Sequence, residues 1–149
     1  MKRLLVCTAL MSLIALPAAL AQSVDDVAAE PAAAEAPADP IVERGRYLVE
    51  GVGMCGQCHT PRNAQGELKQ AEWLGGAPVP VPMPAGWSNP WAYKAPRIAG
   101  LTQFTDEEFV TLMTTGVNRD GRELMLPMPP FRMTAEDATA IAAYLRTLR

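Results

Sequence analysis

Two cysteines and a histidine lie close together about a third of the way along the 149-residue chain, in the segment Cys55-Gly56-Gln57-Cys58-His59. Two thiols three residues apart, with a histidine directly after the second, are the attachment pattern of a covalent c-type haem. The thiols can bond to the porphyrin edge, and a ring nitrogen of His59 can bind the iron. The pattern therefore predicts one haem c, attached through Cys55 and Cys58, with His59 as an iron ligand.

Other uses of this cysteine pair fit the sequence less well. A structural disulfide needs no histidine at this position. A thioredoxin-like redox site needs a strand before the motif and a βαβ pattern around it, and the sequence has neither. A zinc site needs about four ligands, whereas residues 22–149 contain two cysteines and one histidine. Haem attachment is the interpretation that uses all three residues.

An iron atom bound by His59 has an open position on its opposite face. His59 is the single histidine of the chain, so methionine is the natural second ligand. Residues 124–133 are the strongest place to look, because this run has neither a helical nor a strand period and its prolines stiffen an extended backbone. We predict Met128, which lies between two prolines, as the sixth ligand. The alternatives that the sequence leaves open are Met125, Met133 and Met83.

A ligating histidine normally donates its other ring N–H to an acceptor that fixes the ring. Pro96, in the segment Ala95-Pro96-Arg97-Ile98, has no N–H of its own but offers a carbonyl oxygen. We predict Pro96 as this acceptor. Arg97 and Arg62 are candidates to meet a haem carboxylate.

The N-terminal segment has the composition of a secretory signal peptide. Lys2 and Arg3 precede an apolar run over residues 4–16, and Ala19-Leu20-Ala21 supplies a small-x-small cleavage pattern. The apolar run is shorter than the roughly 18 residues that a membrane-spanning helix requires. We therefore predict a signal peptide over residues 1–21, a periplasmic mature chain, and no membrane span in that mature chain.

The mature chain divides into a linker and one domain. Residues 22–40 are rich in alanine, proline and acidic side chains and contain no aromatic residue, which predicts a disordered linker. Residues 41–149 form the predicted domain, in which eleven basic residues balance eleven acidic ones. The domain therefore lacks the excess of positive charge that is typical of nucleic-acid-binding proteins.

The predicted domain is all-α. Capping residues and apolar periodicity predict helices over about 39–53, 105–116 and 134–148. The density of prolines in residues 77–96 excludes a helix there and predicts a long loop, with a short extended ribbon around 79–83. The sequence shows no convincing sheet.

Taken together, residues 41–148 resemble a class I, single-haem c-type cytochrome. The resemblance rests on the segments Gly45-Arg46-Tyr47-Leu48, Cys55-Gly56-Gln57-Cys58-His59-Thr60, Ala95-Pro96-Arg97-Ile98, Met128-Pro129 and Ala143-Tyr144-Leu145. It implies a cytochrome c fold, with three main helices around one covalent haem. It also implies His59/Met128 ligation with the Pro96 carbonyl holding the histidine, and a crossing of the first and last helices at Gly45 and Tyr144.

Within that class, three further segments are similar to cytochrome subunits of periplasmic dehydrogenases for alcohols, aldehydes or sugar acids. The segments are His59-Thr60-Pro61-Arg62-Asn63, Leu74-Gly75-Gly76 and Thr115-Gly116-Val117 with Asp120-Gly121. Those subunits often carry three haems, whereas this chain has one attachment motif. The resemblance implies an electron carrier, not itself an enzyme, between a dehydrogenase donor and a respiratory acceptor. The alternative is a five-coordinate haem enzyme or gas sensor, which would need a distal acid–base group.

Overall fold

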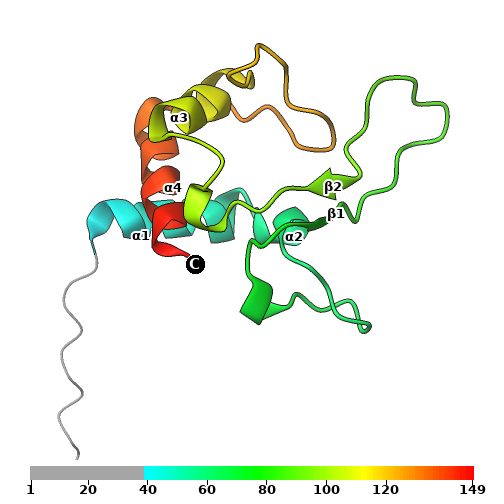
Figure 1. Cartoon of the computed structure of the whole chain (residues 1–149), viewed down its shortest axis with the longest axis horizontal. Helices are drawn as coiled ribbons and strands as arrows, with labels where there is room; N and C mark the ends of the chain where they lie inside the picture. Colours follow the sequence, from blue (N-terminus) through cyan, green and yellow to red (C-terminus); the bar gives the residue numbers. More distant parts are fainter. Residues whose placement is uncertain (1–38) are drawn as a thin grey trace, which may run out of the picture. The chain divides into compact units, whose positions relative to one another are not determined.

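The computed structural model describes residues 39–149. The predicted signal peptide, residues 1–21, and almost all of the predicted linker, residues 22–40, lie outside the described residues. Within residues 39–149, no helix is both long enough and apolar enough to cross a membrane. The elements, shown in Figure 1, are α1 (Pro40–Tyr47), η1 (Leu48–Val52), α2 (Gly56–His59), η2 (Gln70–Glu72), β1 (Ala77–Pro78), β2 (Lys94–Ala95), η3 (Ala99–Leu101), α3 (Asp106–Thr115) and α4 (Ala135–Thr147).

The described part of the chain is mostly helical, and the three predicted helices are present. Helix α1 begins after the N-cap Asp39, whose carboxylate accepts from the Ile41 N–H. Helix α3 begins with a capping box between Thr105 and Glu108. The first helix was expected to run as one α-helix to about residue 53; instead the α-helical part ends at Tyr47 and a π-helical turn, η1, follows.

The prediction of a ribbon around residues 79–83 is wrong. The strands instead lie at the two ends of the proline-rich loop, where β1 and β2 pair antiparallel with Ala77 opposite Ala95 and Pro78 opposite Lys94. The Val79 N–H still donates to the Tyr93 carbonyl, 3.0 Å away. The alternating prolines after Val79 carry no N–H, so the ladder cannot continue into the loop.

Helices α1 and α4 cross (Figure 1), and Gly45 of α1 lies against α4. A Cβ atom added to Gly45 would collide with the carbonyl oxygen of Ala140 and lie 2.8 Å from the Cβ of Tyr144. The expected close approach at this glycine is therefore confirmed.

The buried Tyr144 ring directs its hydroxyl toward Glu50 of η1, where it donates to Oε1 over 2.6 Å. Burial, reinforced by this carboxylate, raises the pKa of Tyr144 to about 12.

The apolar core lies between α1, η1, α3 and α4. Its buried side chains come from η1, α3, α4, the segment around η3 and the residues after η2, and the partly buried Val42 of α1 packs against them. They include Leu48, Val49, Leu74, Leu101, Phe109, Met113, Ile141, Tyr144 and Leu145. The core fixes the helices that form one wall of the site described below.

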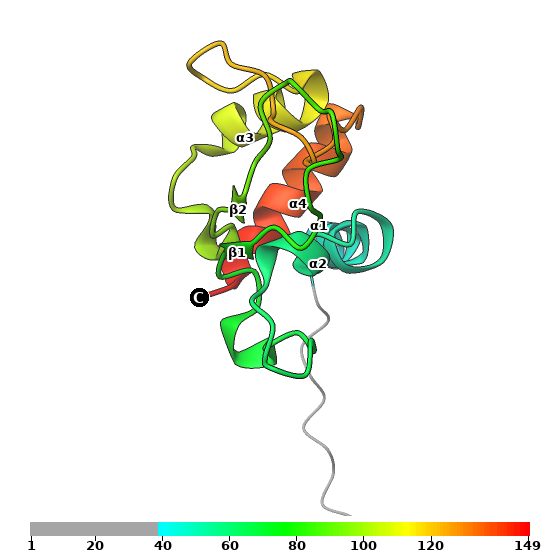
Figure 2. The same ribbon diagram turned by 90° about the vertical axis from the view of Figure 1, so that its right-hand side faces the viewer.

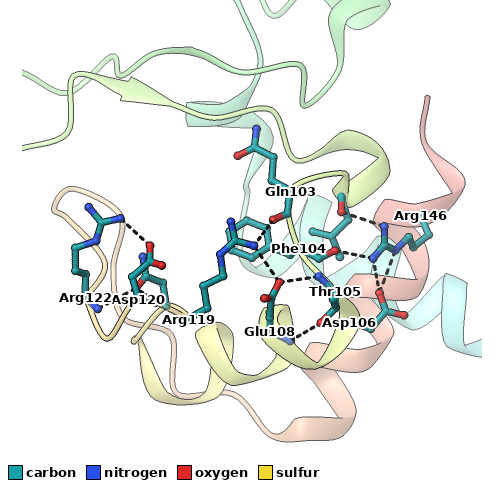
Figure 3. A network of polar contacts seen from close by, with 11 residues as sticks. Gln103, Phe104, Thr105, Asp106, Glu108, Arg119, Asp120, Arg122 and Arg146 are labelled. Carbon is teal, nitrogen blue, oxygen red and sulfur yellow. Dashed lines mark hydrogen bonds and ion pairs between the residues drawn. The ribbon is translucent and has the colours of Figure 1, made fainter.

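A polar network on the outside of this core joins α4 to the start of α3 (Figure 3). The Arg146 guanidinium donates to the carbonyl oxygens of Gly100, Leu101 and Phe104 and pairs with Asp106 at 2.8 Å. One side chain thus donates to three backbone carbonyls in the segment that precedes α3. Arg146 therefore holds the segment between η3 and α3 against α4.

The same network reaches the loop that follows α3. Arg119 donates to the Gln103 carbonyl over 3.3 Å and to Glu108 over 3.4 Å (Figure 3). Glu108 in turn accepts from the backbone N–H of Thr105 in the capping box. The start of the loop over residues 117–133 is therefore tied to the N-terminal end of α3.

We predict opposite effects for two alanine substitutions in the first helical segment. Gly45→Ala should destabilise the folded protein by about 3 kcal/mol, because the new methyl group meets the α4 backbone. Gly51→Ala meets the Tyr47 ring at 3.6 Å, an ordinary contact, and should leave stability unchanged or raise it by up to about 1 kcal/mol. Denaturant unfolding of both variants measures this difference, and equal stabilities would contradict the crossing.

Candidate functional site

The Cys55–His59 motif forms a single short turn of helix, α2, with Cys55 at its N-cap. Its entry is fixed by the Cys55 N–H, which donates to the Val49 carbonyl over 3.0 Å. The turn packs against the indole ring of Trp73, and a Cβ atom at Gly56 would collide with that ring. A residue without a side chain is therefore required inside the motif.

No disulfide joins Cys55 and Cys58. Burial raises the pKa of the Cys55 thiol to about 11, and the neighbouring Cys58 adds to this effect. The thiol is therefore protonated at neutral pH. A raised pKa is typical of a buried structural cysteine, whereas redox-active cysteines have lowered pKa values.

His59 is buried, with 6 % of its surface exposed. Its Nδ1 lies 2.8 Å from the carbonyl oxygen of Pro96. Because a carbonyl can only accept, Nδ1 must carry the proton, which leaves the Nε2 lone pair free for a metal. Burial lowers the pKa of His59, an effect that the Pro96 bond partly opposes, so the ring is neutral. A neutral imidazole with a fixed tautomer is the form that binds iron.

Three backbone contacts bring Pro96 to His59. The Gly76 N–H donates to the His59 carbonyl over 2.7 Å. Gly76 itself has φ +88°, and a Cβ atom there would lie 2.7 Å from the Arg97 nitrogen, so a larger residue would push the Pro96 segment away. The Ile98 N–H donates to the Leu74 carbonyl, which closes the other end of the same segment.

A cavity of about 520 Å³ opens above α2. Cys55, Cys58 and His59 form one side of it, and apolar side chains of α3 and α4 form another. The remaining walls come from residues 91–98 and from the loop over 124–131. The volume lies within the roughly 300–1,000 Å³ range of ligand pockets. An apolar cavity that offers two thiols and an imidazole with a free Nε2 fits a covalent haem.

Two of the candidate methionines line this cavity and two do not. Met128, which is half-buried, and Met125, with 48 % of its surface exposed, both line it. Met133 instead packs against the core, and the Met83 sulfur accepts a hydrogen bond from the Tyr93 hydroxyl at 3.9 Å. Met128 and His59 therefore border the same cavity, and ligation of iron by Met128 stays a prediction. Two other methionines that sequence analysis did not propose as ligands, Met54 and Met113, also line it.

The two arginines proposed for a haem carboxylate lie elsewhere. Arg62 donates to the Gly66 carbonyl and to the Gln57 side chain, each over 2.8 Å, and Arg97 donates to the Ala99 carbonyl over 3.1 Å. Neither lines the cavity, whereas Lys94 does. Sequence analysis missed Lys94, because only the pairing of β1 with β2 reveals where it stands.

We predict that the Thr60 hydroxyl stabilises the proximal side of the site, the side that carries His59. Thr60 is 1 % exposed, and its Oγ1 accepts from the Leu74 N–H over 3.0 Å. Thr60→Val keeps the shape but leaves that N–H unpaired, so it should cost about 1–3 kcal/mol of stability. The matched control is Thr111→Val, which makes the same change at an exposed position of α3. Denaturant unfolding, followed through the absorbance of the bound haem, measures the stability of each variant. Thr111→Val should be as stable as the wild type. The prediction is contradicted if Thr60→Val is also as stable as the wild type.

Comparison with known proteins agrees with this site. The sequence profile of the cytochrome c family matches residues 42–149. A diheme cytochrome c-type protein of Cereibacter sphaeroides is 61% identical over 41 residues, covering 28% of this chain and 14% of that protein. The gluconate 2-dehydrogenase cytochrome c subunit of Pantoea cypripedii is 33% identical over 137 residues, covering 83% of this chain and 29% of that subunit.

A third relative has a similar description. The fructose dehydrogenase cytochrome subunit of Gluconobacter japonicus is 30% identical over 110 residues, which cover 70% of this chain and 21% of that subunit. The chain thus spans less than a third of the length of these three relatives. The profile, in contrast, covers nearly all of the described residues, including Cys55, Cys58 and His59. This chain belongs to the cytochrome c family and carries a covalently bound haem c with its iron.

Proposed function

We propose that the chain is an electron carrier that passes one electron at a time through a single haem c. In this proposal Cys55 and Cys58 hold the haem, and His59 and Met128 bind the iron from opposite sides. The observation that carries the proposal is the apolar cavity that His59 and Met128 both line. The resemblance of the Met128-Pro129 segment to the methionine segment of class I cytochromes supports the choice of Met128.

The haem iron supplies the one-electron chemistry. The protein residues supply orientation and exclusion of water. The Pro96 carbonyl fixes the ring plane of His59, and the buried walls from α3 and α4 keep water from the inner part of the cavity. A thioether opposite an imidazole raises the reduction potential relative to harder ligands. Two ligands that stay in place in both oxidation states leave little to rearrange during transfer.

The donor and acceptor form a second part of the proposal. We infer that the donor is a dehydrogenase and that the acceptor is a respiratory redox protein. Relatives described as cytochrome subunits of gluconate and fructose dehydrogenases support the class of donor. We further propose export to the periplasm, through a signal peptide over residues 1–21 and a linker over 22–40, followed by the cytochrome domain over 41–149.

A five-coordinate haem enzyme or gas sensor is the competing function. Such a protein needs an open iron position and a group that can exchange protons beside it. Among the described residues that line the cavity, His59 is the single histidine, and no aspartate or glutamate is present. Tyr93 and Lys94, which could also exchange protons, are both solvent-exposed. This lining favours the electron carrier. Ready binding of carbon monoxide by the reduced wild-type protein would favour the competing function.

We predict that Met128→Leu removes the iron–thioether bond. The oxidised wild-type protein should show the long-wavelength absorption band of a methionine-ligated haem. The substitution should abolish this band and lower the reduction potential, because leucine offers no ligand. Met125→Leu is the matched control, since Met125 lines the same cavity one turn away. If Met125→Leu removes the band and Met128→Leu does not, the sixth ligand is Met125 and the assignment is wrong.

A further inference from the structure

We propose that Lys94 binds a haem carboxylate at the mouth of the cavity and raises the reduction potential of the iron through its positive charge. This inference rests on the proposed function, because it requires a redox-active haem in this cavity. Lys94 acts as a positioning residue for the haem rather than as a ligand of the iron.

The first observation is the charge of the cavity lining. Among the described residues that line it, Lys94 is the one lysine or arginine, and no aspartate or glutamate lines it. Lys94 is also solvent-exposed, which places it at the mouth rather than in the interior. A haem carries two carboxylates, and an anion cannot enter an apolar interior without a partner. The carboxylate edge is therefore expected at the mouth, where Lys94 offers a cation.

The second observation is that most of the other basic residues already make an ion pair or a side-chain hydrogen bond. Eight of the eleven basic residues in the described range already have a partner; they are Arg44, Arg46, Arg62, Lys69, Arg97, Arg119, Arg122 and Arg146. The three that make no ion pair or side-chain hydrogen bond with residues 39–149 are Lys94, Arg132 and Arg149. Of these three, Lys94 alone lines the cavity.

The third observation is that the backbone holds Lys94 in a fixed position relative to the iron ligand. Lys94 lies in β2, opposite Pro78 of β1, while its neighbour Ala95 turns to the buried side. The next residue along, Pro96, accepts the hydrogen bond from His59. Lys94 is therefore carried on a strand that pairs with β1, which lies next to α2 (Figure 1), and that leads directly into the contact with His59.

Charge explains why this contact would matter for electron transfer. Reduction removes one positive charge from the iron, so a nearby cation favours the reduced state. Lys94 offsets one of the two negative carboxylates, which otherwise favour the oxidised state. Because the lysine is exposed, the solvent screens part of this effect. Loss of the lysine charge should therefore lower the reduction potential by a measurable but modest amount.

The experiment compares Lys94→Gln, Lys94→Arg and Arg97→Gln in the complete haem-loaded protein. Arg97→Gln is the matched control. It removes the same unit charge three residues after Lys94, from a side chain that donates to the Ala99 carbonyl instead of lining the cavity. The haem carboxylates are labelled with ¹³C, and infrared difference spectra are recorded between the oxidised and reduced states. Reduction potentials are measured on the same samples. The long-wavelength iron–thioether band is recorded for each variant.

We expect the labelled carboxylate bands to shift in Lys94→Gln and to stay in place in Lys94→Arg and Arg97→Gln. We also expect a larger fall in potential for Lys94→Gln than for Arg97→Gln. Carboxylate bands that do not move in Lys94→Gln would overturn the inference, whatever happens to the potential. A missing iron–thioether band in the wild type would instead contradict methionine ligation, so the two failures are distinguishable.

Discussion

The hydrogen bond between His59 and the Pro96 carbonyl is the contact on which the rest of the site depends. A buried ring N–H without an acceptor costs roughly 1–3 kcal/mol, and a ring free to rotate would not present Nε2 in one direction. Pro96 is suited to this place because it has no N–H that would itself need a partner. The contact joins residues 37 positions apart, so the intervening chain has to return to the same point. The Gly76 N–H and the Thr60 hydroxyl provide that return.

The opposite side of the cavity is built differently. Two loops rich in proline, residues 78–93 and 117–133, extend from the helical part and lie beside each other in Figures 1 and 2. The Ala92 N–H donates to the Leu126 carbonyl over 2.6 Å and links the two loops. Trp91 donates from Nε1 to Val81 within the first loop. Prolines reduce the conformational freedom of such loops in the unfolded chain, so fewer contacts suffice to order them.

Local signals in the sequence were enough to predict α3, α4 and the start of α1. The capping box at Thr105, the cap at Thr134 and the left-handed Gly116 that ends α3 all act within a few residues, and the structure has each of them. The close approach at Gly45 was also predictable, because a mid-helix glycine is costly unless something packs on it. Lys94 was not predictable. Its position depends on the pairing of β1 with β2 across a long loop, and no local pattern encodes that pairing.

The two faces of the cavity therefore differ in how firmly they are held. The proximal face consists of a buried histidine on α2, tied to neighbouring segments by backbone and side-chain hydrogen bonds. The distal candidates Met125 and Met128 lie in a partly exposed loop, where the Met128 N–H donates to the Met125 carbonyl over 3.2 Å. Segments with few buried contacts open at lower free energy than the core. Local opening of this fold should therefore begin on the distal face, while His59 and the two cysteines keep the haem attached.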